Sequence, residues 1–210
     1  IARPDPATLI GARDKALMQM LYNTGARVQE IADLRIADLR TAGPPTVTLT
    51  GKGRKQRVVP LWQETVDLIG HYLQRRKQAG IESEHLFLNH RAAPMTRFGI
   101  GRRVALHAES AGHRCASLRD RSITPHVGRH TTALHLIEAG NDITVVRDWL
   151  GHADLKTTSQ YIEVSIERKR AALDKVPTPA SSTETPAPTW QTPSLIQLLT
   201  KLSRSKHYVA

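Results

Sequence analysis

Residues 124–152 read TPHVGRHTTALHLIEAGNDITVVRDWLGH, a stretch that contains the start and end signals of two successive helices. Thr124 offers a capping hydroxyl. Pro125 suits the first helical turn, because the N–H that proline lacks would have no intrahelical partner there. Gly140 and Gly151 are placed to end the first and the second helix. The stretch therefore predicts two helices joined by a short turn.

The sequence around this stretch predicts more helices and one β-hairpin. Apolar residues at helical spacing predict helices over 13–23 and over a run that starts at Val28. Further helices are expected over 62–78 and over a basic segment that ends near Ala111. Two β-branched runs within 46–60 flank a glycine-rich turn, which is typical of a hairpin. A short extended piece is expected at 86–88 and a polar loop at 112–123. The expected fold is mostly α with a small antiparallel β-sheet.

Composition divides the chain at Pro177. Residues 1–176 have the mixed composition of one folded domain. Residues 177–193 are rich in proline, serine and threonine, which is typical of a linker. Residues 194–210 predict a leucine-rich amphipathic helix that is too short to be stable alone. We therefore expect it to dock, either on its own domain or on a neighbouring protomer.

The charge balance favours an anionic partner. Lysine and arginine outnumber aspartate and glutamate by 30 to 19, which gives a formal net charge of +11. Such a surplus suits a polyanion, although charge alone is equally compatible with an ordinary basic surface. The single cysteine, Cys115, excludes an internal disulfide framework and fits a reducing compartment. No leader and no apolar run of membrane-spanning length is evident, so we expect a cytoplasmic protein that does not bind membranes.

Five segments carry polar groups that hydrophobic packing does not explain. His126 and Arg129 are three residues apart, His152 follows Arg129 by 23, and Tyr161 follows His152 by nine. The five segments are TGARVQE at 24–30, GKG at 51–53, HVGRH at 126–130, LGH at 150–152 and TTSQY at 157–161.

This ordered set resembles the tyrosine recombinase (phage integrase) family, over roughly residues 10–175. That family has an arginine in a TG-x-R-x-x-E segment, a hairpin lysine, an H-x-x-R pair, an L-G-H segment and a tyrosine nine residues later. The chain departs from it at Gly128, where leucine is common, and at Thr132, where phenylalanine is common. Only 26 residues precede Arg27, too few for the N-terminal DNA-binding domain that the family usually has. The sequence thus fits either an excised catalytic fragment or a minimal enzyme.

The resemblance implies a catalytic domain that exchanges DNA strands. Tyr161 would be the nucleophile that forms a 3′-phosphotyrosine, because a phenolate is a good leaving group and keeps the link reversible. Lys52 would be the general acid that protonates the leaving 5′-oxygen. No metal or other cofactor is implied, since the histidines lack neighbours at metal-ligand spacing.

The remaining site residues would surround the phosphate. Arg27 and Arg129 would clamp its oxygens, because a guanidinium stays charged and donates two parallel hydrogen bonds. His126 and His152 would hydrogen-bond the phosphate, with His126 the expected acceptor of the tyrosine proton. Glu30 would orient Arg27 or His126. The expected DNA contacts are Arg54, Lys55, Arg57, Arg97, Arg102 and Arg103.

Two other functions fit parts of the pattern. A DNA-binding module that has lost catalysis would keep the basic surface, and a type IB topoisomerase would use related chemistry on one strand at a time. Taken singly, most of these residues also have ordinary structural explanations, such as a surface pair between Arg27 and Glu30. The complete, ordered set favours the recombinase, whose expected partners are a double-stranded DNA site and other copies of the chain. The family commonly exchanges its C-terminal helix within a tetramer.

Overall fold

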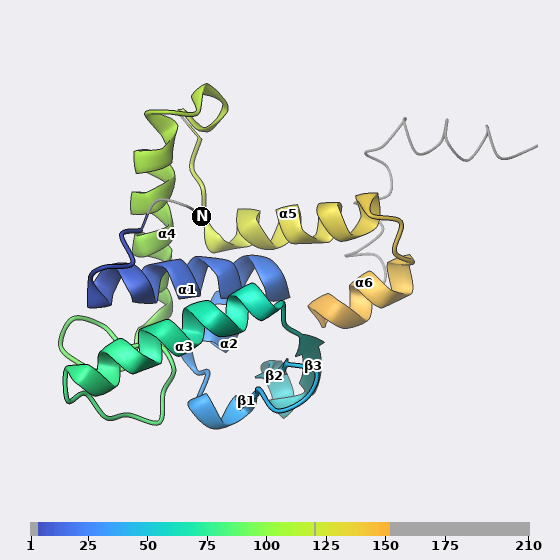
Figure 1. Cartoon of the computed structure of the whole chain (residues 1–210). Coiled ribbons are helices and arrows are strands. Elements are labelled where there is room, and N and C mark those ends of the chain that lie inside the picture. The colour runs from blue at the N-terminus through green and yellow to red at the C-terminus, as the bar shows by residue number, and fades with distance from the viewer. Residues whose placement is uncertain (1–3, 120, 152–210) are drawn as a thin grey trace, which may run out of the picture. The chain divides into compact units, whose positions relative to one another are not determined.

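The computed structural model describes residues 4–119 and 121–151 (Figure 1). The linker expected at 177–193 and the helix expected at 194–210 lie outside the described residues. In the described part, the α-helices are α1 (Leu9–Thr24), α2 (Val28–Ala32), α3 (Gln63–Gln78), α4 (Arg97–Gly112), α5 (Pro125–Glu138) and α6 (Ile143–Leu150). The strands are β1 (Leu39–Arg40), β2 (Thr46–Thr50) and β3 (Gln56–Pro60). Short 3-10 turns lie at Ile36–Asp38, Lys52–Arg54 and Ala116–Leu118.

The prediction of a mostly helical fold with a small antiparallel sheet is confirmed. The Thr124 hydroxyl caps α5 by accepting from the N–H of Val127, and Gly151 ends α6 with a left-handed φ of 65°. The helix predicted over 13–23 corresponds to α1, which begins earlier, at Leu9. Its N-cap is Thr8, whose hydroxyl accepts a hydrogen bond from the N–H of Gly11 at 3.0 Å.

The sheet has one more strand than the sequence predicts. β2 and β3 form the expected hairpin, with Val47 opposite Val59 and Leu49 opposite Arg57. β1 adds a third antiparallel strand by pairing Leu39 with Val47. It is only two residues long, too short for an alternating pattern. The extended piece expected at 86–88 is buried but forms only an isolated bridge from Leu88 to Pro94.

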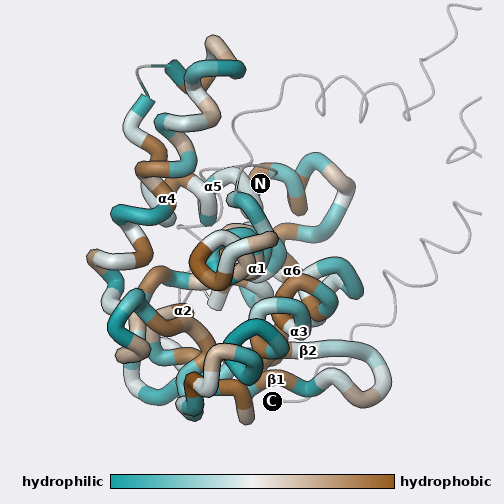
Figure 2. Tube along the Cα trace, turned by 60° about the vertical axis from the view of Figure 1, so that its left-hand side comes forward, coloured by the Kyte–Doolittle hydropathy of each residue, from teal (hydrophilic) through white to brown (hydrophobic). Residues whose placement is uncertain are grey.

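Two hydrophobic clusters hold the described part together. The larger one joins α1, α2, the sheet, α3 and α4 around side chains such as Leu17, Met20 and Ile31, which are fully buried. The smaller one joins α5 to α6 through Ala133, Ile137, Val146 and Leu150. Hydrophobic residues recur between hydrophilic ones along the helices (Figure 2). None of the helices in the described part is long and apolar enough to cross a bilayer.

A buried charge cluster also fastens α4 to α1. Asp14 is fully buried, and it accepts hydrogen bonds from Arg13, Arg103 and His107. Burial raises the pKa of Asp14, but the hydrogen bonds from His107 and Arg103 and the charge of Arg13 outweigh it, so that the pKa lies below its ordinary value. The Arg103 guanidinium, which the sequence predicts to contact DNA, thus binds Asp14, and its contact with DNA stays a prediction.

Replacing Asp14 by asparagine is expected to lower the free energy of unfolding by about 3–5 kcal/mol at pH 7, because two arginines lose their carboxylate. Urea denaturation measures this loss. The folded-state pKa of Asp14 is depressed, so its ionised form stabilises the fold above the unfolded-state pKa. That contribution disappears as the pH falls through the folded-state value. The difference between the variant and the parent should therefore shrink in acid.

Asp33→Asn is the matched control, because the exposed Asp33 carboxylate accepts a hydrogen bond from Gln29 on the surface. Its unfolding free energy should change by no more than about 0.5 kcal/mol. Equal losses in the two variants, or a loss for Asp14→Asn that does not change with pH, would contradict this role.

Candidate active site

A pocket of about 600 Å³ brings together two residues that the sequence predicts to be catalytic. Arg27 lies at the junction of α1 and α2, and Lys52 lies on the turn between β2 and β3. The full lining is Arg27, Gly51, Lys52, Lys55, Gln56, Arg57, Asp148 and Gly151. Three separate parts of the chain therefore build this pocket: the α1–α2 junction, the hairpin and the end of α6.

The local backbone places Arg27 at the pocket. Gly25 ends α1 in the left-handed region with a φ of 56°. A β-carbon added to Gly25 would lie only 2.6 Å from Cδ2 of Leu150, so a larger residue would collide there. Arg27 then becomes the N-cap of α2 in an extended conformation. Its side chain is 46% exposed, so its guanidinium is accessible to a ligand.

The carboxylate of Glu30 binds both Arg27 and Arg57 and holds them in place. Its side chain is only 3% exposed. One oxygen accepts from the backbone N–H of Arg27 at 2.8 Å, and the other accepts from its guanidinium at 3.1 Å. Arg57 donates to both oxygens, at 2.9 and 2.7 Å. Of the two roles expected for Glu30, the contacts favour the orientation of Arg27.

The cluster formed by Glu30, Arg27 and Arg57 carries a net positive charge. Burial raises the pKa of Glu30, but the hydrogen bond and charge of Arg57, followed by those of Arg27, outweigh it, so that the pKa is lowered. The carboxylate is therefore ionised near neutral pH. Two guanidiniums around one carboxylate leave an excess of one positive charge, next to the exposed ammonium groups of Lys52 and Lys55.

Three arginines also bind the C-terminal carbonyls of α6. Arg57 donates to the carbonyl of residue 149 at 2.9 Å, Arg129 to that of residue 150 at 2.6 Å, and Arg27 to that of residue 151 at 3.2 Å. These carbonyls have no partner within the helix and carry the negative end of its dipole. Figure 1 shows α6 running back from the end of α5 toward β3. The arginines thus fix the end of α6 at the edge of the pocket.

Arg129 lies beside the pocket lining. It is buried on α5 and also donates to the carbonyl of Gly25 at 2.6 Å, two residues before Arg27. His126 is exposed on the first turn of α5, and its Nε2 lies 2.7 Å from Nε2 of His130. The other two expected catalytic residues, His152 and Tyr161, lie outside the described residues.

The hairpin turn presents Lys52 at the surface. Gly51 closes the turn by donating its N–H to the carbonyl of Lys55 at 2.8 Å. A side chain at Gly51 would come within 3.1 Å of the Glu30 carboxylate. Gly53 and Arg54 have positive φ values of 73° and 58°, so the turn is tight and Arg54 adopts a conformation that non-glycine residues rarely adopt.

The residues expected to bind DNA fall into two groups. Arg54, Lys55, Arg97 and Arg102 are exposed, and the Arg97 guanidinium lies over the ring of Phe98, 4.7 Å from its centre. Arg57 and Arg103 have their guanidiniums engaged within the protein. Arg57 holds Glu30 and the end of α6 and also lines the pocket, and its expected contact with a phosphate stays a prediction. Its position two residues before the buried Val59 could have indicated that it points inward.

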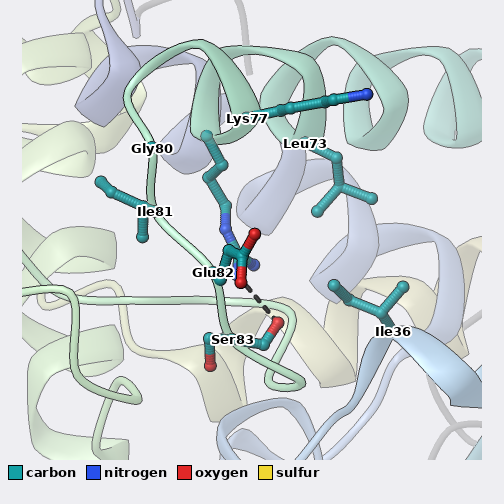
Figure 3. A pocket seen from close by; sticks show the side chains of 8 residues that line it. Ile36, Leu73, Lys77, Gly80, Ile81, Glu82 and Ser83 are labelled. Carbon is teal, nitrogen blue, oxygen red and sulfur yellow. Dashed lines mark hydrogen bonds between the residues drawn. The ribbon is translucent and has the colours of Figure 1, made fainter.

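A separate pocket of about 310 Å³ near the C-terminal end of α3 includes Leu73, Lys77 and Glu82 (Figure 3). It contains none of the expected site residues. Within residues 4–119 and 121–151, no three His, Cys, Asp or Glu side chains gather closely enough to hold a metal ion.

Known proteins resemble this chain over most of its length. The model of the phage integrase family matches residues 4–168. The tyrosine recombinase XerC of Pelobacter propionicus is 39% identical over 165 residues, which cover 79% of this chain and 52% of that protein. The tyrosine recombinase XerD of Corynebacterium glutamicum is 37% identical over 172 residues, which cover 81% of this chain and 54% of that protein. The chain thus spans about half the length of these curated relatives.

Solved structures agree with this similarity. The XerH site-specific recombinase bound to a palindromic difH substrate superimposes with a TM-score of 0.67 at 27% identity, over 80% of this chain and 47% of that chain. The XerA recombinase has a TM-score of 0.67 at 26% identity, over 85% of this chain and 66% of that chain.

Arg57→Lys is expected to lower the free energy of unfolding by about 2–4 kcal/mol, because an ammonium cannot reproduce the fork that binds Glu30 and the end of α6. Urea denaturation measures the change. Arg54→Lys, on the exposed turn, is the control and should leave stability nearly unchanged. The substitution keeps the positive charge, so an unchanged stability of Arg57→Lys would contradict this structural role of the guanidinium.

Proposed function

This chain belongs to the phage integrase family, and from that premise we propose that it is a site-specific DNA recombinase that cleaves and rejoins DNA through a 3′-phosphotyrosine intermediate. The observation that carries the proposal is the pocket in which Arg27 and Lys52 meet. A half-exposed guanidinium, held by the buried carboxylate of Glu30, lies there beside an ammonium on a separate turn. This combination suits a phosphodiester.

Electrostatics explain why such a pocket would accelerate phosphoryl transfer. Negative charge accumulates on the non-bridging oxygens as the tyrosine oxygen attacks phosphorus. A donor that is already oriented toward that charge stabilises the transition state, by roughly 3–4 kcal/mol per donor. Arg27 is preorganised in this way by three contacts, two with Glu30 and one with the carbonyl of Gly151. Arg129 is proposed as the second clamp.

Each bond change in the proposed reaction has a residue assigned to it. The Tyr161 oxygen forms the bond to phosphorus while the bond from phosphorus to the 5′-oxygen breaks. His126 takes the phenol proton, Lys52 gives a proton to the 5′-oxygen, and His152 hydrogen-bonds the phosphate. The new 5′-hydroxyl then attacks the phosphotyrosine of the partner strand. One phosphoester replaces another, so the exchange needs no nucleotide cofactor.

The proposed substrate is a double-stranded DNA site. The net charge of +11 and the exposed Arg54, Lys55, Arg97 and Arg102 support it. The similar XerH site-specific recombinase has been solved bound to a palindromic difH substrate. Arg54 and Lys55 are proposed to contact phosphates beside the pocket, and Arg97 and Arg102 to extend the contact along α4.

A nicked duplex tests the proposal, because the nick traps the covalent product. The sequence of the duplex is taken from the DNA near the protein's own gene that the protein protects from nuclease digestion. We expect a protein–DNA adduct on a denaturing gel that is absent for Tyr161→Phe. Arg27→Lys, which keeps the charge, should slow adduct formation by about 100-fold or more, since the oriented fork is lost.

Other outcomes identify the alternatives. DNA binding without an adduct in the parent protein would favour a binding module. Relaxation of supercoiled DNA without strand exchange would favour a type IB topoisomerase.

Assembly through the C-terminal segment is a second part of the proposal. Residues 194–210, which lie outside the described residues, are proposed to dock on a neighbouring protomer and to build a tetramer on DNA. The segment at 177–193 would reach roughly 55 Å if extended, enough to span to a neighbour.

Deleting residues 190–210 is expected to leave the folding of the monomer intact and to impair assembly on DNA. Circular dichroism checks the folding, and native gels of the protein–DNA complexes check the assembly. Unchanged assembly would contradict exchange between protomers. A destabilised monomer would indicate docking of the segment on its own domain.

A further inference from the structure

His126 has a close partner on its own helix. His130 follows it by one turn of α5, and residues four apart lie on the same helix face. The Nε2 atoms of the two rings are 2.7 Å apart, and the ring centres are 4.1 Å apart with the planes nearly perpendicular, at 81°. The capping hydroxyl of Thr124 and Pro125 at the first position fix the turn from which His126 projects.

The contact between two Nε2 atoms restricts the protonation of both rings. A hydrogen bond at this distance needs a proton on one Nε2 and a lone pair on the other. In a neutral pair, the ring that donates through Nε2 therefore has an unprotonated Nδ1. The partner thus decides which nitrogen of His126 carries its proton, and a fixed partner fixes the tautomer.

The surroundings favour His130 as the acceptor. Burial lowers the pKa of His130, and the neighbouring His126 and Arg129 lower it further. The positive end of the α5 dipole acts in the same direction. A neutral His130 can accept the N–H of His126, which leaves Nδ1 of His126 with a lone pair.

We propose that His130 is a positioning residue that orients His126 and fixes its tautomer, so that His126 takes the nucleophile's proton on Nδ1. This inference rests on the proposed function. The phenol proton moves to Nδ1 of His126 as the oxygen–phosphorus bond forms. The resulting imidazolium is stabilised by its Nε2–H, which donates a charge-assisted hydrogen bond to His130. The arrangement follows the general pattern of nucleophile, base and a third group that orients the base.

His135 is the matched control on the same helix. It also forms a side-chain hydrogen bond, between its Nδ1 and the hydroxyl of Tyr22 at 2.7 Å, but its partner lies on α1 and is not an expected site residue. The loss of either histidine removes an imidazole that contacts another side chain from α5. Only the loss of His130 should impair the proposed base.

Single-turnover cleavage of the nicked duplex tests the role. His130→Ala should slow cleavage by about ten- to hundredfold with unchanged DNA affinity, as expected for partial loss of general-base catalysis. His130→Gln, which can still accept from His126, should restore most of the rate. His130→Ala combined with His126→Ala should be no slower than His126→Ala alone, because the partner acts only through His126. His135→Ala should cleave like the parent.

A substrate with sulfur in place of the bridging 5′-oxygen locates the defect. A thiolate leaves without a proton, so this substrate should relieve the defect of Lys52→Ala but not that of His130→Ala. The tautomer of His126 can also be measured directly in the protein without DNA. The ¹⁵N resonances of the His126 ring should show one dominant tautomer in the parent and a mixture of tautomers in His130→Ala.

Three results would overturn the inference: parental cleavage by His130→Ala, additive effects of the two histidine substitutions, or mixed tautomers of His126 in the parent protein. The failure of the wider proposal looks different. In that case the parent itself forms no adduct, whatever the tautomer of His126.

Discussion

The structure around the pocket depends on one buried carboxylate. Glu30 is almost fully enclosed and is shared by Arg27 and Arg57. A lone buried carboxylate would cost several kcal/mol, and each arginine would be unbalanced without it. The two guanidiniums meet this cost and extend to the carbonyls of residues 149 and 151. One interaction thus ties the start of α2, the third strand and the end of α6 together.

This linkage explains how short elements hold a site that spans 125 positions of the sequence. α2 has five residues and β3 has five, and neither could be stable alone. The end of α6 contributes three carbonyls that need donors, and arginines from three distant segments supply them. Under the proposed function, two of these arginines, Arg27 and Arg129, would bind the phosphate as well as cap the helix.

The sequence predicts the secondary structure better than it predicts the side-chain pairings around the site. The caps of α5 and α6 and the β-branched runs of the hairpin are local signals, and they predicted these elements correctly. The direction of a long side chain is not local. Arg103 pairs with Asp14, 89 positions earlier, and Arg57 pairs with Glu30, 27 positions earlier. The composition shows that the chain has many arginines, but only the folded structure shows which of them pair with carboxylates inside the protein.

The choice between arginine and lysine follows from the work each position does. Arg27, Arg57 and Arg129 each bind two separate acceptors at once, which needs a planar group with donors on several edges. Lys52 lies exposed on a tight turn that lines the same pocket as the α1–α2 junction. A group that must give up a proton cannot be a guanidinium, whose pKa is too high, whereas an ammonium can transfer one. Rigid forks around a carboxylate and one transferable proton on a turn would thus be complementary parts of the proposed site for phosphoryl transfer.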